Sequence, residues 1–172
     1  QLPGMAHARI LRSPHAHARL TSVDASKAKA LRGVIATLTR DDIQAFNYKY
    51  GATYKDQSIV AVDKVRYVGD PVAAVLADDA ATAEEALELI EVEYDELPKV
   101  TNIEEAIAPN APLVHEAGVA RAELRGSVYG APERFNRTNI CYYLSFGRKD
   151  VVKGFAEADH VFEDTFRFQK VQ

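Results

Sequence analysis

Two histidines separated by one residue, His15 and His17, have the spacing of side chains on one face of a β-strand. Two imidazoles on one face could begin a metal site, but a metal site normally needs three or four protein ligands. The sequence supplies no Cys or His cluster at a spacing that would complete the set. We therefore favour a structural or inter-domain contact for this pair over a metal site.

Carboxylates are the second group of side chains that could do chemistry. Asp70 lies between Gly69 and Pro71, and aspartate in such a turn accepts backbone hydrogen bonds, so we interpret it as a turn residue rather than a catalytic one. An acidic run follows, in which helix and strand periodicity places most members on solvent-facing sides. We interpret the run as solvated surface: Glu84, Glu85, Glu88, Glu91, Glu93, Asp95 and Glu96.

Cys141 is the only cysteine of the chain. It lies out of phase with Ile140 and Tyr142 in a predicted strand, which favours an inert, buried or half-buried thiol over a reactive one. A single cysteine cannot form an internal disulfide, nor can it supply the roughly four thiolates of an iron–sulfur cluster.

Arginines are concentrated in an irregular, glycine-containing stretch between residues 117 and 138. They could form an anion site or contact a partner, but we favour a mobile linker kept soluble by charge: Arg121, Arg125, Arg134 and Arg137. The sequence contains no glycine-rich phosphate loop at a strand–helix junction and no Gly-x-Ser-x-Gly elbow. We assign no catalytic, cofactor-binding or metal-binding residue to this chain.

Composition limits the class of protein. The 172 residues suffice for one sizeable core, and a hydrophobic content of 47% favours a globular protein over a disordered one. The formal net charge of −4 argues against a nucleic-acid-binding protein, which would present a basic face. No apolar run approaches the roughly 18 residues needed to cross a membrane. With a single cysteine and no visible signal peptide, these features predict a cytoplasmic location.

The apolar run Val72–Ala77 is the element that must organise the rest. A strand with one wet face alternates polar and apolar residues, whereas a strand covered on both faces does not. Because this run has no polar break, we predict that it is the buried central strand of a sheet. Gly69 and Pro71 mark the turn before it, since glycine accepts unusual backbone angles and proline suits the first position of a strand.

A helix is predicted directly after this strand, over Asp79–Ile90, with Asp78 as its cap. Its apolar residues follow the i, i+3, i+4, i+7 spacing of a core-facing stripe: Ala83, Ala86, Leu87 and Ile90. The other elements are shorter. We expect strands at 5–11, 15–20, 34–38, 59–62, 65–68, 92–97, 140–146 and 161–168, a surface loop at 46–54, and helices at 25–31, 39–43, 102–108 and 151–158 capped by Asp24, Thr39, Asn102 and Asp150.

Several segments resemble, in the same order, the large subunit of the molybdenum hydroxylases, the xanthine dehydrogenase, aldehyde oxidase and carbon monoxide dehydrogenase group. The most specific is 65–75, with the sequence VRYVGDPVAAV. The segments 11–19, 83–94, 112–116 and 150–172 resemble the same subunit, and 117–138 matches it least. On this resemblance, 1–116 is an α/β-hammerhead domain, 117–138 a linker, and 139–172 the truncated start of a molybdopterin-binding domain.

The resemblance implies an α+β fold, with a mixed sheet and a few packed helices. It also implies a parent oxidoreductase that hydroxylates aldehydes, purines or related substrates with water as the oxygen source. Its cofactors would be molybdopterin with molybdenum, held by downstream domains, together with iron–sulfur clusters and often FAD, carried on other domains or subunits. The pterin-binding and catalytic segments of that family lie beyond residue 172, so we expect this chain to serve as scaffold and interface, inactive alone.

A free-standing, non-catalytic protein-binding module is the alternative, with 46–54 and the arginine-rich stretch as its recognition surface. The aromatic strand predicted at 161–168 argues against this alternative, because it would be left without a partner strand at its edge. We therefore favour the interpretation of the chain as part of a longer enzyme.

Overall fold

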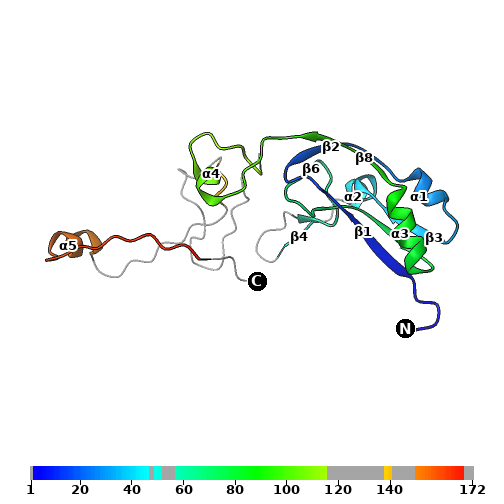
Figure 1. Ribbon diagram of the computed structural model, residues 1–172, viewed down its shortest axis with the longest axis horizontal. Helices are drawn as coiled ribbons and strands as arrows, with labels where there is room; N and C mark the ends of the chain where they lie inside the picture. Colours follow the sequence, from blue (N-terminus) through cyan, green and yellow to red (C-terminus); the bar gives the residue numbers. More distant parts are fainter. Residues whose placement is uncertain (1, 47–48, 52–56, 116–137, 141–149, 169–172) are drawn as a thin grey trace.

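The computed structural model describes residues 2–46, 49–51, 57–115, 138–140 and 150–168. The strands are β1 (His7–Arg12), β2 (Ala18–Asp24), β3 (Val34–Leu38), β4 (Lys49–Tyr50), β5 (Gln57–Ser58), β6 (Lys64–Val65), β7 (Pro71–Ala77) and β8 (Glu91–Glu96). The helices are α1 (Ser26–Ala30), α2 (Arg40–Phe46), α3 (Ala80–Glu88), α4 (Ile103–Ile107) and α5 (Val151–Ala156). Figure 1 shows strands β1 to β8 with helices α1 to α3 gathered at one end of the chain's path.

The strands form three antiparallel sheets, with the orders β1-β7-β3, β6-β2-β8 and β4-β5. The α+β class is confirmed, but the expected mixed sheet is wrong for the described strands, because every pairing among them is antiparallel. The helices explain why. Parallel neighbours need a crossover that returns to the same sheet, whereas α1 joins β2 to β3 and α3 joins β7 to β8, each linking two different sheets.

Strand β7 is central, as its apolar run predicts, with β1 on one side and β3 on the other. Ala73 and Val75 face one core cluster, and Val72 faces a second cluster on the opposite side. Ala74 and Leu76 are only half-buried, so the shielding on that second face decreases toward the end of the strand. The run lies in the middle of its sheet and not at an open border.

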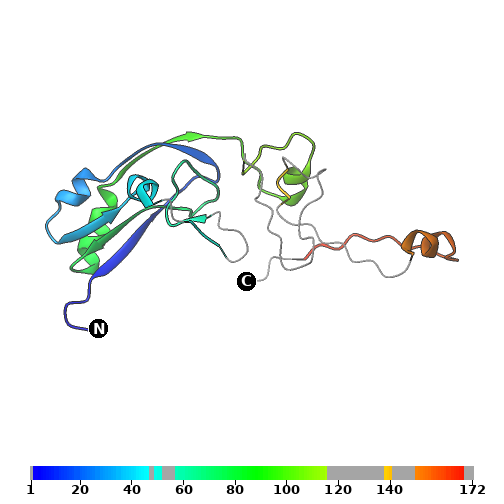
Figure 2. The ribbon, with the colours of Figure 1, turned by 180° about the vertical axis from the view of Figure 1, so that it is seen from behind.

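Small side chains let the helices approach this sheet closely. Helices α1 and α3 lie against the sheet β1-β7-β3 (Figure 2). Their buried residues are mostly alanines, and the first cluster contains Ala25, Ala28, Ala73, Val75, Ala86 and Ile90. The second cluster lies between β7 and the sheet β6-β2-β8 and contains Ala18, Leu20, Ala61, Val65 and Val72. The predicted stripe on α3 is confirmed, with Leu87 partly buried beside it.

Among the caps of α3, α4 and α5, only the cap of α3 differs from the sequence prediction. The side chain of Asp79, not that of Asp78, caps α3, because its Oδ1 accepts the amide hydrogen of Thr82 at 2.9 Å. Asn102 and Asp150 cap α4 and α5 as predicted. Adjacent aspartates have the same capping chemistry, so only the backbone angles of the turn decide between them.

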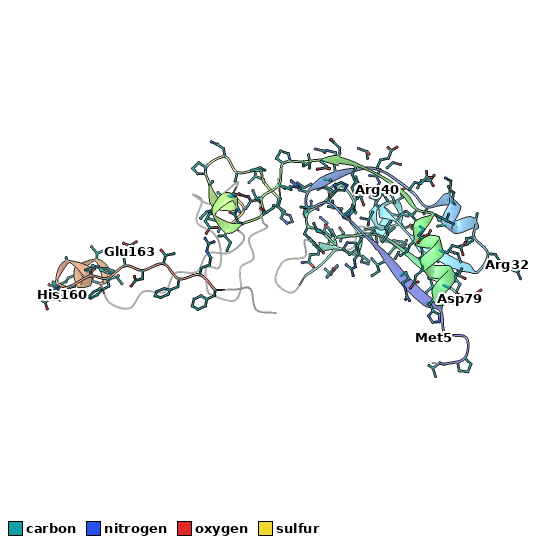
Figure 3. The ribbon with its side chains drawn as sticks, in the orientation of Figure 1. Met5, Arg32, Arg40, Asp79, His160 and Glu163 are labelled. Carbon is teal, nitrogen blue, oxygen red and sulfur yellow. The ribbon has the colours of Figure 1, made fainter. Side chains whose placement is uncertain are left out.

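Two other predicted caps bond differently. Asp24 accepts the amide hydrogen of Ser26, but it lies one residue before Ala25, which is the N-cap residue of α1. At α2, which extends to Phe46, Asp42 accepts both the amide and the hydroxyl hydrogens of Thr39. Helix α2 is also tied to β2, since Arg40 donates to the carbonyl of Leu20 at 2.6 Å; Arg40 is labelled in Figure 3.

Several predicted strands differ in the structure. The strand expected at 15–20 begins only at Ala18, and those expected at 65–68 and 59–62 are replaced by β6 and β5. Two residues of the loop expected at 46–54 form β4. The segment 161–168 is not a strand: it is exposed, and no described strand pairs with it. Most of the strand expected at 140–146 and of the linker 117–138 lies outside the described residues.

Candidate interface site

The turn before β7, residues 66–70, is a compact hydrogen-bonded unit. The Asp70 carboxylate accepts the amide hydrogen of Arg66 at 2.9 Å, and the Asp70 amide donates to the carbonyl of Tyr67 at 3.1 Å. Gly69 has a φ of +93°, a left-handed angle that favours glycine, with no neighbouring atom within 4 Å of where a Cβ would stand. The structure thus gives Asp70 the turn role that its neighbours predict.

The residues after β1 hold this turn in place. Ser13, which is buried, donates its amide hydrogen to the Asp70 carbonyl at 2.9 Å and accepts the Gly69 amide hydrogen at 2.8 Å. Arg12 donates from Nη1 to the Gly69 carbonyl at 2.9 Å. The sequence pattern did not predict this contact, because hydrogen bonds between segments more than fifty residues apart leave no periodicity. Serine before proline is typical of a turn, but such a pair does not identify the segment that the turn contacts.

A pocket of about 270 Å³ opens beside the turn. Its described walls come from strands β4 and β5, from residues 61–70 and from the segment that follows α4: Tyr50, Gln57, Ser58, Ala61, Val62, Arg66, Tyr67, Asp70, Val114 and His115. Arg66 donates from Nη2 to Asp63 and from Nη1 to the Lys64 carbonyl. Its Nε is buried and has no hydrogen-bond partner in the described part of the chain.

Burial sets the electrostatics of this pocket. It raises the pKa of the half-buried Asp70 carboxyl above the ordinary value, although the hydrogen bond from the Arg66 amide and the Arg66 charge oppose the change. Burial and the nearby Asp70 charge also raise the pKa of the Tyr67 phenol. The pocket therefore combines a fixed cation, a carboxyl that resists ionisation and two phenols, a set suited to hydrogen bonding with a polar surface.

The two histidines do not act as a pair. His17 is buried, and its Nδ1 lies 2.7 Å from the Pro98 carbonyl, so Nδ1 carries the hydrogen and donates it. The ring of His15 packs on Tyr94 with centroids 4.6 Å apart, and its Nδ1 lies 3.4 Å from Glu96. Because the pair precedes β2 rather than lying in it, the shared face predicted for a strand is absent, and each ring makes its own structural contact.

The remaining candidates divide into two groups. The acidic run is exposed, as predicted, and several of its members pair with cations or with a histidine at the surface; Arg9 binds Glu84 and Lys27 binds Glu91. Cys141 and the four arginines between 117 and 138 lie outside the described residues.

These features define a small α+β unit built of antiparallel sheets and a few helices. Residues 1–98 match the family model described as "Aldehyde oxidase and xanthine dehydrogenase, a/b hammerhead domain". The chain therefore belongs to this family, and the resemblance to the large subunits of molybdenum hydroxylases is confirmed.

Individual relatives agree with the family match. The chain is 38% identical over 168 residues to a probable xanthine dehydrogenase subunit from Bacillus subtilis, covering 98% of this chain and 20% of that protein. It is 37% identical over 174 residues to the carbon monoxide dehydrogenase large chain of Afipia carboxidovorans, covering 99% and 21% respectively. A crystal structure of Cu,Mo-CO dehydrogenase matches 65% of this chain and 14% of that one, with 43% identity and a TM-score of 0.61. The chain thus spans about a fifth of the length of these curated relatives.

The described residues were compared with what a metal ion or a cofactor cradle requires. Among them, no group of three or more His, Cys, Asp or Glu side chains could hold a metal ion. Gly69 satisfies a backbone angle in the open and does not shape a cradle that a side chain would fill. We therefore assign no step of molybdenum chemistry to these residues. No helix in the described part of the chain is long and apolar enough to cross a membrane.

Proposed function

We propose that this chain is the scaffold and interface part of the large subunit of a molybdenum-dependent oxidoreductase. The match of residues 1–98 to the hammerhead family is the observation that carries the proposal. The complete enzyme would hydroxylate an aldehyde, a purine or a related substrate, with water as the oxygen source. Molybdopterin, iron–sulfur clusters and FAD would be bound by other domains or subunits in the cytoplasm, and holding such cofactors is a task separate from their chemistry.

The exposed apolar side chains around the turn support an interface role. Val68 is 66% exposed, and two tyrosines that line the pocket, Tyr67 next to it in sequence and Tyr50, are also exposed. Apolar and aromatic side chains grouped at a polar pocket are typical of a contact surface. This surface would receive the downstream domain of the same large subunit.

Metal content tests the cofactor part of the proposal. The complete protein, purified from cells supplied with molybdenum, should retain molybdenum and oxidise an aldehyde or a purine. Residues 1–172 expressed alone should retain none and show no oxidase activity. Molybdenum that copurifies with residues 1–172 would contradict the proposal. A complete protein without molybdenum would favour the free-standing binding module.

A matched pair of substitutions tests the interface part in the complete protein. Val68→Arg places a charge on the proposed contact surface, whereas Ile35→Arg places it on β3, where the side chain is 55% exposed. We expect Val68→Arg to lower molybdenum retention and activity several-fold, because a buried unpaired charge is costly. Ile35→Arg should change neither quantity. Equal behaviour of the two variants would argue against an interface at this turn.

A further inference from the structure

Asn139 makes three hydrogen bonds to a distant segment of the chain. Its Oδ1 accepts the amide hydrogen of Val114 at 2.9 Å. Its Nδ2 donates to the carbonyls of Ala106 at 3.0 Å and Pro112 at 2.9 Å. An amide side chain offers two donor hydrogens and one acceptor oxygen, so both hydrogens and the oxygen are in use here. The side chain is part-buried, and all three of its partners are backbone groups. The bonds therefore depend on the Asn139 side chain and on the path of the backbone, not on the side chains of residues 106, 112 and 114.

These bonds join α4 and the segment after it to a point far along the chain. The partners lie 25, 27 and 33 residues before Asn139 in sequence. Bringing such distant points together costs loop-closure entropy, which the hydrogen bonds must offset. Figure 1 shows the short yellow segment around residue 139 beside α4, and Figure 2 shows the same proximity from behind. The family resemblance assigns Asn139 and residues 106–114 to different domains, whereas these hydrogen bonds join them.

Val114 connects this cluster to the pocket. Its amide is bound by Asn139, and Val114 itself lines the pocket together with residues of the turn at 66–70. We infer that Asn139 is a positioning residue: it clamps residues 106–114 and sets the Val114 wall of the pocket. The clamp needs the two donor hydrogens of an amide, since two of its three partners are carbonyl oxygens.

Two asparagine-to-aspartate substitutions in the complete protein test the clamp. Asn139→Asp keeps the acceptor but sets a carboxylate against two carbonyls. Asn102→Asp is the matched control, because Asn102 uses only its Oδ1, as the cap of α4. We expect amide hydrogen exchange at Val114 to accelerate about tenfold or more in Asn139→Asp, and to stay within about twofold in Asn102→Asp. Equal acceleration in both variants, or none in either, would overturn the inference.

Two further measurements separate positioning from general stability. Amides of β7 should keep their protection in Asn139→Asp and in Asn139→Ala; loss of protection there would make Asn139 a residue of global stability and overturn the role. The introduced carboxyl should also regain one donor hydrogen when protonated. Val114 protection in Asn139→Asp should therefore recover as the pH falls, whereas Asn139→Ala should show no recovery. A pH-independent deficit in Asn139→Asp would contradict the need for donor hydrogens.

Discussion

Val75 gives the sharpest test of the packing around β7. The side chain is 1% exposed and belongs to the cluster that α1 and α3 cover. Val75→Ala removes two methyl groups, worth about 1.6 kcal/mol at roughly 0.8 kcal/mol each. The small cavity left between closely packed alanines adds to this cost. We therefore expect the free energy of unfolding to fall by about 2 kcal/mol, and Tm of residues 1–172 to fall by roughly 4–8 °C.

Chemical denaturation and thermal melting measure these quantities directly. Ile35→Ala is the control, because it removes more carbon from a neighbouring strand but at a side chain that is 55% exposed. Its effect should stay within about 0.5 kcal/mol. If the two variants lost similar stability, or if Val75→Ala left the midpoint unchanged, the central buried position of β7 would be refuted.

Two more predictions concern the turn. Gly69→Ala should destabilise the protein by about 1 kcal/mol, because a φ of +93° strains any L side chain even in open space. Gly154→Ala, with equally open space inside helix α5, should not destabilise it, and equal losses on denaturation would contradict this account. Burial raises the pKa of the Asp70 carboxyl in the folded protein above the ordinary 3.8, so the folded state holds this proton more tightly than the unfolded chain does. The free energy of unfolding therefore falls as the pH rises from 3.8 through the folded-state pKa. Asp70→Asn abolishes this titration, so Tm of the variant relative to the wild type should increase as the pH rises above about 4; a constant difference would argue against a buried carboxyl.

Local sequence patterns correctly predicted those strands, helices and turns whose formation depends on a single residue type or on a single spacing. The unbroken apolar run gave a strand covered on both sides, and the stripe on α3 gave a helix with one buried face. Gly69 and Pro71 marked the turn, and Asn102 marked the start of α4. In each case the signal lies within a few residues of the feature that it specifies.

Predictions failed where the outcome depended on a partner elsewhere in the chain. The segment 161–168 has the alternation of a strand, but a strand needs a hydrogen-bonded neighbour, and no described residue provides one. His15 and His17 have the spacing of a shared face, but the chain enters β2 only at Ala18. The role of Asn139 could not be seen at all, because its partners lie at least 25 residues away.

The amino-acid sequence by itself determined which segments are apolar on one face or on two, where the turns fall, and to which family the chain is similar. Tertiary structure alone decided that β7 lies between β1 and β3, that the sheets are antiparallel, and that Ser13 and Asn139 fasten distant segments. The physical reason is that hydrophobic periodicity records which side of an element avoids water. It does not record which other element covers that side.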